Sequence, residues 1–170
     1  DDMILNAEER IFELIQFDYF RKNVTGNLTT ANTYLTAPSD FVMSFSLAII
    51  DTIPEYHYLD KKHATFMREY NRDTIAESQR GKPLYYADFD KELSTGTDNG
   101  STLIVAPIPD RDYTVELHYL YKPISLTSQT AGTWISKNAR NALLYGCLIE
   151  ASTFMKSEPE MQVLYESRFG

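Results

Sequence analysis

The sequence predicts an α+β fold, in which N- and C-terminal helices pack as a small bundle and an antiparallel β-sheet region with one short helix is inserted between them. Near both ends of the chain, apolar residues recur every three or four positions, which is the period of a helical face. In the middle of the chain, apolar and polar residues alternate, which is the period of a strand with one buried face. Helices and strands segregated along a chain in this way are typical of α+β domains.

The length favours a single domain. The chain has 170 residues, 43% of them hydrophobic, which is enough for one self-sufficient core. It contains no repeat and no linker long enough to separate domains. We therefore expect one domain over residues 1–170, with helical parts at about 3–20 and 136–169 and a β-rich insertion at about 24–123.

The first helix is predicted from one apolar stripe near the N-terminus. Its members lie three or four residues apart: Ile4, Ala7, Ile11, Leu14 and Ile15. The neighbouring charged residues, Glu8 among them, are expected mostly on the other side of the helix.

The β-rich region is predicted to begin with a hairpin. Two β-prone segments, Val24 to Thr30 and Thr33 to Thr36, flank a turn at Ala31-Asn32. A break at Pro38 follows, and then a strand over residues 41–50. Its alternation predicts a core face made of Phe41, Met43, Phe45, Leu47 and Ile49.

A short strand and a short helix come next. Residues 56–59 are predicted as the strand, and Asp60 is expected to cap a helix from Lys61 to about Arg72. Leu84 to Asp88 and Thr102 to Val105 are then predicted to pair as a hairpin.

The clearest strand lies at residues 113–121 and ends at Pro123. Alternate residues are apolar or aromatic, which predicts one core face: Tyr113, Val115, Leu117, Tyr119 and Tyr121.

Two helices are predicted to close the chain. Ser136 is expected to cap the first, which runs to about Met155. Its apolar face is predicted from five positions: Ala139, Leu143, Cys147, Ala151 and Phe154. Ser157 and Glu160 have the spacing of a capping box for the second. Trp134 could act as a staple that fixes the entry into the first of these helices or as an interface anchor, and we favour the staple.

The charge balance disfavours a protein that grips nucleic acid. Acidic residues outnumber basic ones by 24 to 16, and the net charge is −8, whereas binding of DNA phosphates needs a surplus of cations. An acidic surface remains compatible with DNA that passes by without being held. No apolar run approaches the roughly 20 residues of a membrane span, so no membrane partner is expected.

The histidines and the single cysteine offer little chemistry. His57 and His63 could form a metal cluster with Asp60, but their spacing across a strand-to-helix junction is poor for a metal, and we favour surface or capping roles. Cys147 falls on an apolar helical stripe and is expected in the core. One cysteine cannot build a disulfide framework and fits folding in a reducing cytoplasm.

Paired carboxylates and known motifs give no site either. Asp88 with Asp90 and Asp110 with Asp112 are predicted to be solvated turn formers. No nucleophile elbow, phosphate-binding loop, dinucleotide fingerprint or zinc-protease motif is present. The prediction is therefore no enzyme, with no catalytic, cofactor-binding or metal residues and no cofactor.

A series of short motifs runs in order along nearly the whole chain. They combine a helix, turns at proline, aromatic strands and a helix that carries a glycine: Ala7-Glu8, Tyr34-Leu35-Thr36-Ala37-Pro38-Ser39-Asp40-Phe41, Gly81-Lys82-Pro83-Leu84-Tyr85-Tyr86, Ala106-Pro107-Ile108-Pro109-Asp110, Tyr119-Leu120-Tyr121-Lys122-Pro123, Trp134, Leu143-Leu144-Tyr145-Gly146 and Glu150-Ala151. Each motif alone is common. In their order and spacing, they resemble the head-to-tail adaptor (connector) proteins of tailed bacteriophages.

The resemblance implies a structural virion protein at the head–tail junction, made in the cytoplasm of a host bacterium. It implies a homo-oligomeric ring, with twelve copies expected, below the portal protein. Such a ring would extend the DNA channel and present a surface for the tail, nozzle or tail-terminator protein, while genomic DNA passes through without specific binding. Its subunits would contact one another through a heterologous interface that closes on itself.

Three other interpretations stay open at the level of sequence. The chain could be another tail-completion protein, a β-rich ligand-binding module that uses exposed tyrosines, for instance for carbohydrate, or an unrecognised hydrolase. Assembly state separates them, because only the adaptor is expected to form a ring or to oligomerise on a portal.

Overall fold

The chain forms two compact units. The structure is a computed structural model, and it describes residues 2–14, 20–51, 55–72, 77–91, 101–129, 131–155 and 159–169. One unit, here the helical unit, comprises residues 1–19 and 123–170, and the other, the β unit, comprises residues 20–122. The predicted α+β class, with helices at the two ends and strands between them, is confirmed.

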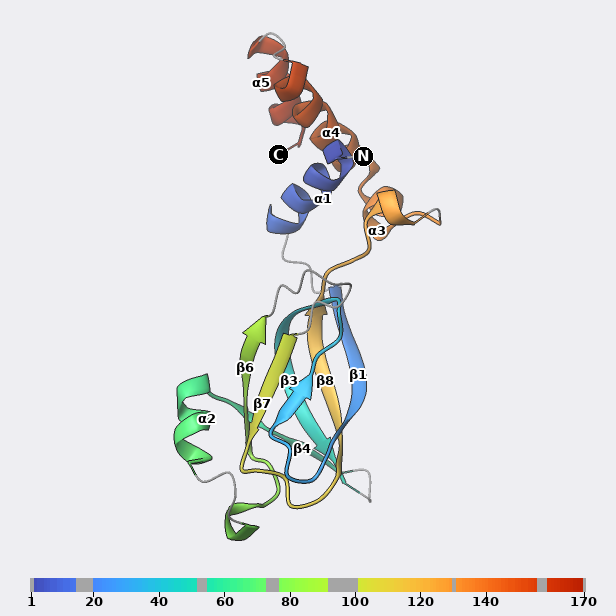
Figure 1. The fold of residues 1–170 in the computed structure, drawn as a ribbon. Coiled ribbons are helices and arrows are strands. Elements are labelled where there is room, and N and C mark those ends of the chain that lie inside the picture. The colour runs from blue at the N-terminus through green and yellow to red at the C-terminus, as the bar shows by residue number, and fades with distance from the viewer. Residues whose placement is uncertain are drawn as a thin grey trace. The chain divides into compact units, whose positions relative to one another are not determined.

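The β unit contains two four-stranded sheets (Figure 1). The strands of the first sheet, in spatial order, are β1 (Arg21–Leu28), β8 (Tyr113–Tyr121), β3 (Phe41–Ile50) and β4 (Tyr56–Tyr58). Those of the second are β2 (Tyr34–Thr36), β7 (Ser101–Ala106), β6 (Tyr85–Lys91) and β5 (Asp60–Lys61). All the pairs are antiparallel except β5 with β6, which is parallel.

The two sheets share one apolar core. Alternate residues of β8 enter it, as predicted for the strand at residues 113–121: Tyr113, Val115, Leu117 and Tyr119 are buried and Tyr121 packs against them. The second sheet contributes Leu35, Tyr86, Leu103 and Val105 from its facing side. The predicted hairpin of β6 and β7 is also confirmed.

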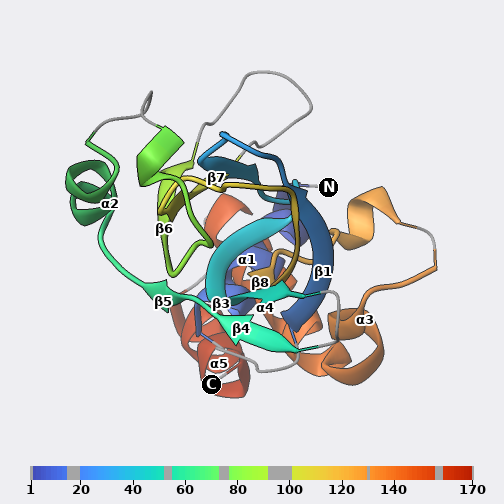
Figure 2. The same cartoon turned by 90° about the horizontal axis from the view of Figure 1, so that it is seen from below.

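A short helix, α2 (Ala64–Tyr70), covers the other face of the second sheet. Met67 is fully buried there against Ala87, Ile104 and Ala106. Figure 2 shows α2 beside β6. The second sheet is therefore covered on both faces, which explains why β7 is buried along almost its whole length.

The predicted hairpin around Ala31-Asn32 is wrong. A turn does occur there, with Ala31 at φ 64° and a hydrogen bond from Asn32 N to Thr29 O of 3.1 Å. However, β1 pairs with β8 and β2 pairs with β7, so the turn carries the chain from one sheet to the other. Turn residues alone cannot distinguish a hairpin from a crossover between sheets, because both need the same reversal of chain direction.

The predicted core face of β3 is wrong in its first half. Met43 and Phe45 are exposed, and Ser44 is 4% exposed. The register of β3 against β8 shifts between Phe41 and Met43 and again between Ser44 and Ser46. Because each irregularity adds a residue to one strand, it moves the following side chains to the opposite face. Leu47 and Ile49 lie in the core, as predicted.

The start of the short helix is also wrong. Asp60 and Lys61 form β5, and the helix begins later, with His63 as the N-cap residue. The backbone N–H of Thr65 donates to Nδ1 of His63 at 3.3 Å. The chain uses Asp60 and Lys61 to pair with β6, a non-local partner that a capping pattern does not reveal.

The helical unit is built around α1 (Asp2–Leu14) and α4 (Arg140–Met155). It also contains the 3₁₀ turn η3 (Leu126–Ser128), α3 (Trp134–Asn138) and α5 (Pro159–Phe169). Ala7 and Ile11 of α1 form its core with Ile135 and Leu143, and Phe169 packs against them. A side chain at Gly146 would lie only 3.1 Å from Cβ of Ala7, so glycine allows α1 and α4 to approach closely.

The helix predicted from Ser136 to Met155 is two helices. α3 ends before α4 begins at Arg140, and Thr133, not Ser136, is the N-cap residue. Thr133 and Ser136 form a capping box, with Ser136 at its third helical position. Trp134 is the first helical residue and half-buried against the helical core, so it is not the residue before the cap that a staple needs.

The predicted apolar faces of the helical unit also need correction. The buried residues of α4 are Leu143, Gly146, Ile149 and Ser152. Cys147 packs only partly against the core, and Phe154 is exposed. Ile15 and Ser157 lie outside the described residues, so the end of the first stripe and the second predicted capping box are not described.

Candidate interaction surfaces

The helical unit exposes apolar side chains on two consecutive helices. They are large and belong to α4 and α5: Leu144, Phe154, Met155, Met161, Val163 and Leu164. Phe154 is 79% exposed and Met155 is 70% exposed. We call these six residues the α4–α5 apolar surface. Large exposed apolar side chains are candidates for contact with a partner, because burial against a partner removes them from water.

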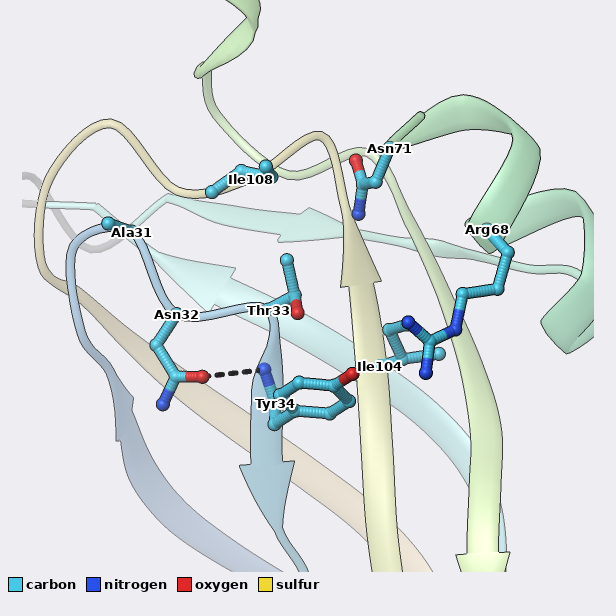
Figure 3. A pocket seen from close by; sticks show the side chains of 8 residues that line it. All are labelled: Ala31, Asn32, Thr33, Tyr34, Arg68, Asn71, Ile104 and Ile108. Atoms are coloured by element: carbon cyan, nitrogen blue, oxygen red, sulfur yellow. Dashed lines mark hydrogen bonds between the residues drawn. The ribbon is translucent and has the colours of Figure 1, made fainter. Parts of the chain in front are cut away.

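A groove of about 380 Å³ lies in the β unit, where β2 begins beside the end of α2 (Figure 3). It is lined by eight residues: Ala31, Asn32, Thr33, Tyr34, Arg68, Asn71, Ile104 and Ile108. We call it the Arg68 groove. The turn at Ala31 and the helix α2 form its sides, and β7 supplies Ile104.

Asn32 and Asn71 fix the shape of the Arg68 groove. Oδ1 of Asn32 accepts a 3.0 Å hydrogen bond from the backbone N–H of Tyr34, which holds the turn against the start of β2. Asn71 is buried, and its Nδ2 donates to the carbonyl of Val105 at 3.0 Å, which ties the end of α2 to β7.

Arg68 supplies a positive charge to the groove. Its guanidinium carbon lies 4.7 Å from the ring centroid of Phe89 and 5.9 Å from that of Tyr34. Both distances are in the range of cation–π contacts. Within the described part of the chain, no carboxylate lies within ion-pair distance of Arg68.

A serine, a lysine and an aspartate meet between the two sheets. Ser44 Oγ donates to Asp88 Oδ1 at 2.6 Å, and Lys61 Nζ lies 2.8 Å from Ser44 Oγ and 2.6 Å from Asp88 Oδ2. A serine beside a lysine can serve as a nucleophile with its base. Here the ammonium is paired with Asp88 and Ser44 is almost fully buried, so the arrangement is suited to joining the sheets.

The residues considered for a metal are not brought together into a cluster. His57 Nε2 lies 3.9 Å from a carboxylate oxygen of Glu55, His63 caps α2, and Asp60 lies in β5. No group of three or more possible metal ligands occurs among the described residues.

Cys147 lies on α4, half-buried against the helical core. Burial raises the pKa of its thiol, and the charges of Glu8 and Glu150 raise that pKa further. A raised pKa disfavours the thiolate, which is the nucleophilic form.

The predicted turn carboxylates have structural partners. Asp112 accepts from both the backbone N–H and the hydroxyl of Thr30, and these two bonds lower its pKa against the effect of desolvation. Asp110 accepts a 2.6 Å hydrogen bond from the hydroxyl of Tyr113. Asp88 is not a turn residue, since it lies within β6.

Residues 1–170, the entire chain, match the family described as SU10 adaptor protein. The chain belongs to this family. SU10 adaptor proteins are head-to-tail adaptors of bacteriophages, so the resemblance inferred from the ordered motifs is confirmed. Comparison with curated proteins gives no match.

As an SU10 adaptor protein, the chain is a structural phage protein. Sequence patterns revealed neither of the two surface features described above. The Arg68 groove unites residues far apart in the chain, and helical periodicity assigned Phe154 to a buried face. None of the helices in the described part of the adaptor is long and apolar enough to cross a membrane.

Proposed function

We propose that this adaptor forms a homo-oligomeric ring below the portal, extends the DNA channel and provides the attachment surface for the tail or its nozzle. Twelve copies are expected from the family resemblance. On this proposal the whole chain acts as one adaptor domain at the head–tail junction of the virion, and it has no enzymatic activity. The alternative of another tail-completion protein shares the structural role but does not require the portal as partner.

The observation that carries the proposal is the α4–α5 apolar surface. Phe154, Met155 and Val163 are each at least 65% exposed. A chain that worked as a monomer would leave these apolar side chains in water. In a ring, a neighbouring subunit or the portal would cover them. Contacts between neighbouring subunits of a ring are heterologous. They close into a ring when the rotation that relates two neighbours is a whole-number fraction of a full turn.

The net charge supports a conduit for DNA. The chain carries a charge of −8, and a ring multiplies this charge around its axis. Like charge repels the phosphates, so DNA can slide past without the counterion release that would hold it.

The direct test is electron microscopy of the purified protein mixed with its cognate portal. We expect added ring-shaped density at the narrow end of the portal. Full-length protein that stays monomeric with the portal, with no added density, would contradict the proposal.

A pair of variants locates the interface. Phe154→Ser combined with Val163→Ser is expected to reduce the occupancy of the ring on the portal at least about tenfold, because it removes apolar area that the contact would bury. Tyr58→Ser changes a residue of the β unit that is 69% exposed and serves as the control. If Tyr58→Ser reduced assembly and the double variant did not, the α4–α5 apolar surface would not be the contact.

A further inference from the structure

The Arg68 groove combines a cation with an apolar wall. Arg68 supplies the charge from α2, and Ala31 and the ring of Tyr34, which is 41% exposed, supply accessible apolar area (Figure 3). Ile104 and Ile108 also line the groove but are each only 2% exposed. A volume of about 380 Å³ is within the range of small ligand sites and accommodates a few side chains. The groove therefore suits a ligand that is anionic at one point and apolar next to it.

Arg68 is positioned to bind an anion from outside the chain. Its contacts with Phe89 and Tyr34 involve ring faces and use no N–H donor, so the guanidinium keeps its donors. Arginine binds carboxylates through two parallel N–H···O hydrogen bonds. The flanking rings already restrict the conformations of the Arg68 side chain, so binding a ligand costs less conformational entropy. In the described residues, Lys22, Lys61 and Lys82 by contrast already have carboxylate partners within 3.2 Å.

The opposite side of the groove adds hydrogen-bond donors. Because Oδ1 of Asn32 is used by the backbone of Tyr34, its amide nitrogen is the end that can donate to a ligand. The hydroxyl groups of Thr33 and Tyr34 also line the groove. Donors around one cation favour a carboxylate, whereas the net charge of −8 disfavours a polyanion such as DNA.

We propose that the Arg68 groove binds a peptide segment in which a carboxylate side chain lies next to an aliphatic or aromatic one. The carboxylate pairs with Arg68, and the apolar side chain contacts Ala31 and the ring of Tyr34. The source of the segment, a protein that attaches to the adaptor at the head–tail junction, is the one part of this inference that rests on the proposed function.

The test uses two fluorescein-labelled pentapeptides with amidated C-termini, Gly-Leu-Glu-Leu-Gly and Gly-Leu-Gln-Leu-Gly, titrated with the full-length protein and followed by fluorescence polarisation. We expect the Glu peptide to bind at least about fivefold more tightly than the Gln peptide. Arg68→Gln is expected to abolish this preference. Arg72→Gln, which changes an exposed arginine one turn further along the chain, is the matched control and is expected to keep it.

A second variant guards against a folding effect of Arg68→Gln. Asn32→Asp keeps the side-chain oxygen that accepts from Tyr34 N but adds a negative charge to the groove. It is expected to weaken the Glu peptide at least about fivefold more than the Gln peptide, because the added charge repels only the carboxylate.

Three results would overturn the inference. They are equal binding of the two peptides, a preference for Glu that survives in both Arg68→Gln and Asn32→Asp, and tighter binding of a labelled oligothymidylate at the same groove. The assay contains neither portal nor tail protein, so its failure would leave the proposed ring intact. Absence of a ring on the portal would likewise leave the peptide result standing.

Discussion

Lys61 and Asp88 form an ion pair of 2.6 Å within one sheet of the β unit, and both contact Ser44 of the other sheet. Lys61 Nζ also lies 3.2 Å from the carbonyl of Ser44. Exposed ion pairs contribute little to stability, but hydrogen bonds from a charged partner to a buried hydroxyl contribute more. The three side chains should therefore stabilise the packing of the two sheets.

Asp88→Asn is expected to destabilise the β unit by about 1–2 kcal/mol, because it removes the ion pair and weakens the acceptor of Ser44 Oγ. Urea unfolding followed by the near-UV circular dichroism of tyrosine measures this change. Asp60→Asn is the control. Asp60 pairs with Lys62 at 3.8 Å on the exposed surface, so its substitution should cost less than about 0.5 kcal/mol. Equal losses in the two variants would contradict a role of the cluster in joining the sheets.

The hydrogen bond between Tyr119 and Asp40 predicts a loss of stability at alkaline pH. Tyr119 Oη donates to Asp40 Oδ1 at 2.9 Å. Burial raises the pKa of Tyr119, and the hydrogen bond and charge of Asp40 raise it further, to about 12. A phenol whose pKa is raised by folding stabilises the folded state fully below its unfolded value near 10 and loses this contribution as the pH rises toward 12.

Tyr119→Phe should therefore flatten the dependence of the unfolding free energy on pH between about 10 and 12. Parallel urea titrations at several alkaline pH values provide the measurement. Tyr58→Phe removes an exposed phenol and is the control, with the same pH dependence as the unchanged protein. A Tyr119→Phe variant as sensitive to alkali as the parent would show that this hydroxyl is not responsible.

Asp40 gives the complementary effect in acid. Desolvation acts to raise its pKa, but the hydrogen bonds from Lys22 and Tyr119 and the charge of Lys22 outweigh it, so the pKa of Asp40 lies below its ordinary value of 3.8. Its contribution to stability is present above pH 3.8 and is lost as the pH falls through the lowered pKa. Asp40→Asn should accordingly reduce the free energy of unfolding at neutral pH, and the difference in this free energy between variant and parent should shrink as the pH falls below 3.8. Urea unfolding of both proteins at neutral and acidic pH measures this change.

The shifted register of β3 predicts opposite outcomes for two positions that sequence alternation places on one face. Leu47→Ala should cost about 2–4 kcal/mol, because Leu47 is fully buried between the sheets. Met43→Ala should cost less than about 1 kcal/mol, because Met43 is 43% exposed. Urea unfolding of both variants is the measurement. Similar losses of stability at the two positions would contradict the shifted register and would support an unbroken alternation along β3.

This strand also shows what local patterns can and cannot predict. The alternation at residues 113–121 identified the buried face of β8 correctly, because β8 pairs without irregularity with β1 and its core side chains follow every second residue. In β3 the same rule failed at Met43, where the pairing with β8 shifts. The irregularity depends on a strand far away in the sequence, which a local period does not contain.

In the helical unit, the prediction of buried residues failed at a contact between segments distant in the sequence. Periodicity located α1 and Ala7 correctly, but it placed Glu8 on the solvent side, whereas Glu8 is 4% exposed. Its carboxylate accepts from Ser125 Oγ at 2.6 Å and from Leu126 N at 3.1 Å, which binds α1 to η3. The Arg68 groove was missed for the same reason, since its parts meet only in the folded chain.

Glu8→Ala is expected to destabilise the helical unit by about 1–3 kcal/mol, because it removes a buried carboxylate and leaves the partly buried N–H of Leu126 without its acceptor. Trp134 is the only tryptophan and lies against the helical core, so its fluorescence reports the unfolding of this unit. Glu8→Gln keeps one acceptor oxygen and should cost less. If both variants unfolded like the parent, the carboxylate would have no role in holding η3.

The acidic charge predicts that the adaptor does not hold DNA. At about 50 mM salt, where electrostatic binding is strong, the unchanged protein should not retain labelled duplex DNA in a filter-binding or gel-shift assay. Glu69→Lys combined with Glu77→Lys raises the net charge at two exposed positions of the β unit without touching its core. Any affinity gained should fall steeply with salt, because each phosphate contact releases a counterion. Retention of DNA by the unchanged protein that persisted at high salt would require specific contacts and would contradict a passive channel.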